Sequence, residues 1–104
     1  MKFMVEYETR LGSTHQETAD NYDSLLKAFS TWQQPDGLTI SAFVTRIDGL
    51  GGYLIVEVDD PLVLARFIAQ FVRWNTVVCH PVVDVEAAVG FVEFGLEWAK
   101  SALG

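Results

Sequence analysis

Hydrophobic and polar residues alternate over residues 2–11, and this period of two predicts a β-strand with two different faces. Stretches rich in β-branched and aromatic residues predict three more strands at 38–47, 53–58 and 76–83. The glycine-rich stretch between the second and third strands predicts a hairpin. Pro81 cannot donate to a strand ladder, so it favours an edge position or a bulge for the fourth strand.

Two segments between the strands carry apolar residues at the three- and four-residue spacing of amphipathic helices. Thr14 and Glu17 have the spacing of a capping box, so the first helix is predicted to start there and to run to about residue 33. Pro61, directly after two aspartates, predicts the start of the second helix, which runs to about residue 74. Asn75 is expected to end it in the left-handed conformation.

Residues 84–103 predict a third helix whose apolar arc covers more than half of its circumference. One neighbouring sheet cannot cover such an arc. If Phe91, Phe94 and Trp98 are exposed, they form a patch of the kind that marks a partner surface.

The predicted order βαββαβα favours an α+β ferredoxin-like fold with an additional C-terminal helix, in one domain over residues 1–104. We expect an antiparallel four-stranded sheet with the first and third strands central and parallel to each other. Both crossover helices then lie on one face, so the other face must be polar, covered by the terminal helix or paired with a second subunit.

Composition excludes some classes of partner. A net charge of -7, without any cluster of Lys or Arg, predicts no binding to nucleic acid or to anionic membranes. No apolar run approaches the roughly 18 residues of a membrane span, and the lone Cys79 cannot form an internal disulfide. These features predict a cytoplasmic protein.

Alternation also predicts which residues line the face that the helices leave open. The third strand would contribute Glu57, and the first and fourth strands would contribute Glu6 and His80. The second strand would add Phe43, Thr45 or Ile47, depending on register. The ligand-binding candidates on this mixed, pocket-like face are Met4, Phe43, Tyr53, Ile55 and Val78.

His80 is the candidate general acid or base, oriented by Glu6 or Glu57. The alternatives are a structural histidine, and a Glu57 that is a buried partner of Arg10 or Arg46 or that lies near the rim beside Asp59 and Asp60. No motif supports a metal site formed by Glu6, Glu8, Glu57 and His80, so we expect no metal and no cofactor. We expect Cys79 to be an inert, buried thiol on the helix side.

Several short motifs resemble a family of uncharacterised short bacterial proteins in the dimeric α/β-barrel superfamily. They are the start 1–5, the pair Gly51-Gly52, residues 57–61, Trp74 and residues 81–84. The resemblance implies that two ferredoxin-like subunits pair their sheets into a barrel. Relatives commonly carry an aromatic residue and a His before the Asp at the end of the second strand, where this chain has Arg46 and Ile47. The superfamily includes cofactor-independent monooxygenases, polyketide cyclases, haem-degrading enzymes and members without demonstrated catalysis.

Three hypotheses follow from these observations. The first is a homodimeric barrel that binds a small apolar or aromatic molecule, with or without a cofactor-independent oxidation, cyclisation or isomerisation. The second is a non-catalytic structural or sensing module whose interior is filled by its own side chains. The third is a subunit that docks on another protein through its terminal helix.

Overall fold

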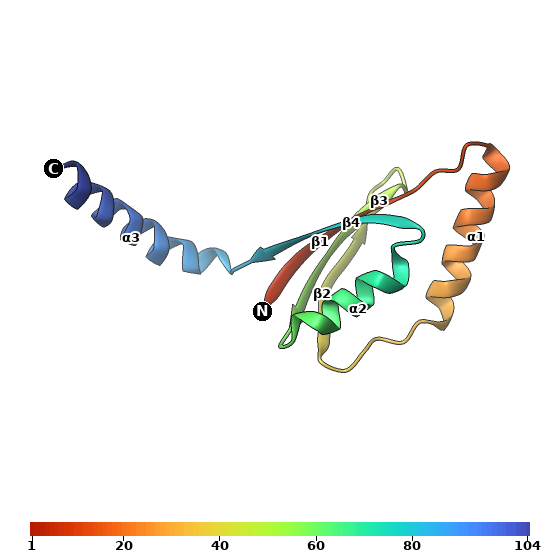
Figure 1. Cartoon of the computed structure of the whole chain (residues 1–104), viewed down its shortest axis with the longest axis horizontal. Coiled ribbons are helices and arrows are strands. Elements are labelled where there is room, and N and C mark those ends of the chain that lie inside the picture. The colour runs from red at the N-terminus through yellow and green to blue at the C-terminus, as the bar shows by residue number, and fades with distance from the viewer.

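The strands and helices follow the predicted order. The computed structural model describes residues 1–104 (Figure 1). Its elements are β1 (Lys2–Thr9), α1 (His15–Thr31), β2 (Leu38–Thr45), β3 (Gly51–Val58), α2 (Pro61–Phe71), β4 (Asn75–Val82) and α3 (Val85–Leu103). The sequence therefore predicted the element types correctly, and the boundaries differ by a few residues.

Local signals at the helix starts explain where the helices begin. The Thr14 hydroxyl accepts a hydrogen bond from the Glu17 amide, as expected for the N-cap of α1. The Glu17 carboxylate accepts hydrogen bonds from the Ser13 hydroxyl at 2.5 Å and from the Ser13 amide at 2.7 Å, and these two bonds lower the pKa of Glu17. Asp60 caps α2, with Pro61 in the first turn. Asn75 was predicted wrongly: it is the buried first residue of β4, and no residue other than glycine has a positive φ.

The sheet has the strand order β2-β3-β1-β4, which is the ferredoxin-like arrangement. β1 and β3 are central, as predicted, but they run antiparallel rather than parallel. The reason is that the crossover through α1 returns β2 parallel to β1, and the hairpin then reverses β3. β4 lies at an edge, which accommodates Pro81 without loss of a ladder hydrogen bond on its free side.

A β-bulge changes which residues of β2 face the helices. The register with β3 shifts between Ile40 and Ala42, so Ser41 is an extra residue. Beyond the bulge, Phe43 pairs with the buried Leu54 and therefore lies on the helix face. The expectation that Phe43 lies on the open face was wrong, because one inserted residue exchanges the two faces of a strand.

The core lies between one face of the sheet and α2. Val5, Leu54 and Val56 from the central strands are at most 3% exposed, and they pack against Leu64 and Phe67 of α2. Only hydrophobic side chains meet there, so the driving force is removal of apolar surface from water, about 25 cal/mol per Å².

The remaining helices contribute little to this core. α1 stands off the sheet and buries none of its residues, and α3 projects beyond the end of β4 as a free-standing helix at the opposite end of the molecule from α1 (Figure 1). The radius of gyration is 18.5 Å, whereas a compact domain of this length has about 13 Å. None of the helices is long and apolar enough to cross a membrane.

The position of the core predicts that alanine substitution of two leucines changes the free energy of unfolding by very different amounts. Leu54→Ala removes a side chain that is 3% exposed, so the free energy of unfolding should fall by about 2–5 kcal/mol in urea denaturation. Leu62→Ala, at a position on α2 that is 59% exposed, is the matched control and should cost far less. Equal losses in the two variants would contradict the assignment of the core.

Candidate functional site

The face of the sheet opposite α2 carries most of the residues that the sequence singled out. Strand pairing places Glu6 between Tyr53 of β3 and Val78 of β4, and places Met4 between Ile55 and His80. These cross-strand neighbours share one face because side chains alternate along a strand. Glu6, His80 and four of the five ligand-binding candidates therefore lie together: Met4, Tyr53, Ile55 and Val78.

The central polar contact of this face joins His80 to Glu6. The His80 Nε2 atom lies 3.3 Å from the Glu6 Oε2 atom, and both side chains are accessible, at 47% and 41%. The two residues come from adjacent strands and are diagonal neighbours, since Glu6 pairs with Val78 and Met4 with His80. A carboxylate at one ring nitrogen fixes the orientation of an imidazole. The geometry thus matches an oriented acid or base with a free path to solvent.

A shallow depression of about 170 Å³ lies next to this pair. Glu6, Glu8, Arg46, Tyr53, Thr76 and Val78 are among its lining residues. The Arg46 guanidinium pairs with the Asp48 carboxylate and lies 3.9 Å from the Glu8 carboxylate, and these acidic neighbours raise the pKa of Arg46. The Asp48 carboxylate accepts a hydrogen bond from the Leu50 amide and another from the Arg46 guanidinium, and both lower the pKa of Asp48, the Leu50 bond more strongly. The lining of the depression therefore includes both a positively charged guanidinium and carboxylates.

Arg46 was not among the residues proposed for ligand binding. The sequence singled it out as a possible partner of Glu57 and as a departure from the pattern of the resembling family. The signal that could have found it is its place directly after β2, where the Arg46 amide donates to the Gly51 carbonyl at 2.7 Å and holds the hairpin closed. A residue at the end of an edge strand can turn its side chain over the open face.

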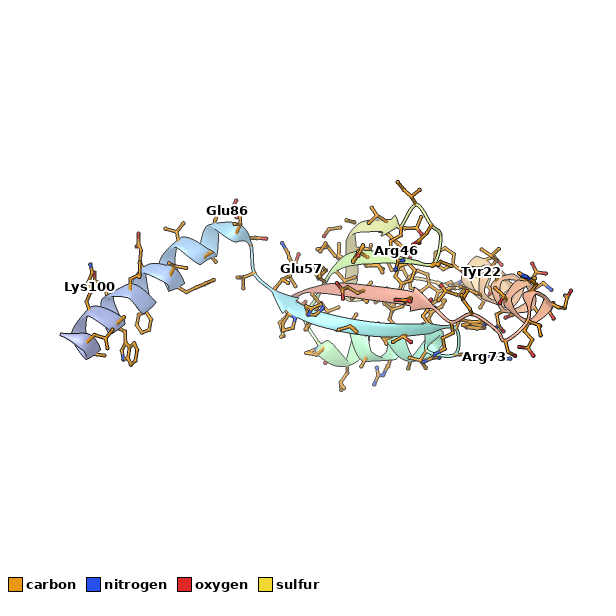
Figure 2. All side chains as sticks on the ribbon, turned by 90° about the horizontal axis from the view of Figure 1, so that it is seen from above. Tyr22, Arg46, Glu57, Arg73, Glu86 and Lys100 are labelled. Atoms are coloured by element: carbon orange, nitrogen blue, oxygen red, sulfur yellow. The ribbon has the colours of Figure 1, made fainter.

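Glu57 lies at the other end of the face, near the point from which α3 leaves (Figure 2). It pairs across the sheet with Lys2, and no ion pair joins it to Arg10 or Arg46. Arg10 instead donates to the carbonyls of Val72 and Arg73. Because Glu57 is exposed and no ion pair joins it to an arginine, the alternatives in which it is the buried partner of Arg10 or Arg46 were wrong. Its exposed position next to the last residue of β3 agrees with the alternative at the rim, and the carboxylate that contacts His80 is that of Glu6.

An almost wholly apolar hollow lies on the helix face, under α1. This cleft has a volume of about 190 Å³, and 11 of its 12 lining residues are hydrophobic. Leu25, Leu26 and Phe29 of α1 form one wall, α2 forms another, and the central strands form the floor. Phe43 lies in this cleft, with its ring edge-on to Phe29 at 5.9 Å between centroids. Phe43 is therefore separated by the sheet from the other predicted ligand-binding residues.

Two further candidates have clear positions. Nowhere does the structure bring three His, Cys, Asp or Glu side chains into an arrangement that could hold a metal ion. Cys79 pairs with Val5 on the helix face, as expected, and burial raises the pKa of its thiol. A raised pKa keeps the thiol protonated near neutral pH and makes it a poor nucleophile.

The raised pKa of the Cys79 thiol predicts slow alkylation of the folded chain. At pH 8, iodoacetamide should modify the folded chain several-fold more slowly than the same chain in urea, because the thiolate is the reactive form and burial disfavours it. The difference should shrink as the pH rises through the folded-state pKa, since the folded thiol then ionises as well. Mass spectrometry over time gives both rates, and equal rates at pH 8 would show that the thiol is not shielded.

Comparison with known proteins identifies a family but no activity. No curated protein matches the chain. A family match covers residues 1–95, which include the whole sheet, α1, α2 and the first half of α3. On this match the chain belongs to the family described as "Domain of unknown function (DUF3303)".

Proposed function

We propose that the open face of the sheet binds a small, mostly apolar or aromatic organic molecule that carries one polar group. The observation that carries this proposal is the contact between His80 and Glu6, set among the apolar side chains of Met4, Ile55 and Val78. Small-molecule sites combine apolar surface with a few convergent polar groups in this way.

The side chains around the pair indicate the class of ligand. Tyr53 is 41% exposed beside Glu6, so its ring can stack on a flat ligand while its hydroxyl meets a polar group. Imidazole, carboxylate and phenol together suit a hydroxyl group, which both donates and accepts hydrogen bonds. A phenol-like molecule therefore fits better than a hydrocarbon or a highly charged metabolite.

The same pair supports a chemical step. His80 with a carboxylate partner can accept a proton from a ligand hydroxyl and return it to another atom of the same ligand. Such a step requires positioning and one proton transfer, and no cofactor enters it. Binding without turnover would make the domain a sensing or carrier module.

A second copy of the chain supplies the missing cover for this site. Val44 is 54% exposed, and Tyr53 and Val78 are more than 40% exposed, on a face that no helix of the same chain covers. Two such faces opposed would enclose a space between two sheets about 10 Å apart. The resemblance to the dimeric α/β-barrel superfamily supports this arrangement, in which the ligand lies between the two sheets.

The proposal predicts binding of a phenolic probe that depends on His80. We expect 2-naphthol to bind the unmodified chain in isothermal titration calorimetry, and His80→Asn to weaken this binding by up to about tenfold, because one hydrogen bond contributes roughly 0.5–1.5 kcal/mol. Mass spectrometry of the freshly purified chain should also reveal a retained aromatic compound.

The other histidine provides the matched control. His15 lies at the start of α1, away from the sheet, so His15→Asn should leave the affinity unchanged. Equal weakening by both substitutions would show that the effect is not local to the open face. An absence of any bound or retained compound would overturn the proposal and favour a module without a ligand.

A further inference from the structure

We propose that α3 is an exchanged arm: in a complex of two copies, α3 of each chain packs against the cleft beneath α1 of the other. This inference concerns how the copies are held together, and it stands on observations other than those at the open face. It does not depend on whether that face binds a ligand.

The exposed surface of the chain is larger than that of a compact monomer, by about the area that a dimer interface buries. The chain exposes 7562 Å², whereas a compact monomer of its mass exposes about 5,800 Å². The excess of roughly 1,700 Å² per chain exceeds the 800 Å² or so that each partner buries in a standard interface, and it falls in the range of obligate dimers. The extended shape of the molecule, 64 Å along its longest axis, agrees with this excess.

α3 itself lacks what a solitary helix needs. It contains Gly90 and Gly95, each of which costs roughly 1 kcal/mol relative to Ala in a helix interior, and Asp84 makes no side-chain cap. Phe91, Phe94 and Trp98 are 58%, 76% and 68% exposed. Because most helical stability in proteins comes from packing an apolar face, this helix requires a surface to pack against.

The cleft beneath α1 has the complementary character. Its floor and two walls are apolar. It can therefore contact more than one side of α3, whose apolar arc covers more than half of the helix circumference. Its volume of about 190 Å³ takes roughly one aromatic side chain, by comparison with an apolar cavity of about 150 Å³ that binds benzene. α1 is incomplete in the same way, since Leu26 is 64% exposed and the helix buries no residue.

The open face fits α3 less well. It carries Glu6, Glu8 and Glu57 beside two cations, Lys2 and Arg46, each of which is already paired with an aspartate. α3 bears Glu86, Glu93 and Glu97 against the single Lys100. Packing α3 on this face would desolvate these charges and bring carboxylates together, whereas the cleft presents no charged residue.

The geometry of one chain directs α3 toward a second copy. α3 and α1 lie at opposite ends of the molecule (Figures 1 and 2), and Lys2 holds Asp84 in an ion pair at the point where α3 leaves the sheet. A second copy turned end for end brings α3 of each chain to α1 of the other, which satisfies both surfaces in a closed, two-fold pair.

Cross-linking between two different variants tests the exchange. In a Cys79→Ala background, a ¹⁵N-labelled Leu26→Cys chain and an unlabelled Phe94→Cys chain are expressed separately, mixed in urea and refolded together, and a short bis-maleimide is then added. We expect a covalent heterodimer that joins positions 26 and 94, and no covalent dimer from either variant alone. Light scattering of the unmodified chain should give the mass of a dimer, and Trp98→Glu should shift it toward the monomer.

Val44→Cys replaces Leu26→Cys in the matched control, since Val44 is similarly exposed but lies on the open face. Linkage of position 94 to position 44, or of two copies of position 94 to each other, would overturn the proposal by placing α3 on the sheet or on a second α3. A monomeric unmodified chain would overturn it as well and would favour docking on a different protein.

Discussion

The fold depends on the removal of apolar surface from one side of a single sheet. Val5, Leu54 and Val56 are enclosed because α2 lies across them, and this layer of contacts fixes the register of the central strands. A sheet has two faces, however, and α2 covers one. The apolar surface that α2 does not cover lies in three places: the open face, the cleft under α1 and the exposed sides of α3.

The sequence predicted what local periodicity determines. Alternation assigned the faces of β1, β3 and β4 correctly, because these strands pair without interruption. It failed for Phe43 because the bulge at Ser41 is a property of the pairing of two strands and leaves no clear mark in the alternation of one. The position of Asn75 likewise depends on a contact between strands that are distant in sequence. Its side chain accepts a hydrogen bond from Thr9, which is 66 residues away.

The candidate site was predictable in part for a related reason. Glu6, Tyr53, Val78 and His80 were placed on one face by counting along strands, and the pairing of β1 with its two neighbours then brings them together. Neither the position of Glu57 at the far end nor that of Arg46 over the depression follows from counting, since both depend on where each strand starts and ends relative to its neighbours. Side-chain chemistry can be identified from sequence, but distance across a sheet requires the register.

The two uncovered surfaces differ in a way that bears on function. The cleft under α1 is almost wholly apolar, so water leaves it readily and an apolar side chain is the occupant that gains most. The open face keeps Glu6, Glu8, His80 and Arg46, whose desolvation is costly unless each finds a partner. A surface of the first kind suits permanent association, and one of the second kind suits a ligand that brings its own polar group and leaves again. Under the two proposals, the cleft would hold the exchanged helix of the second copy, and the open face would hold a ligand that the second copy encloses.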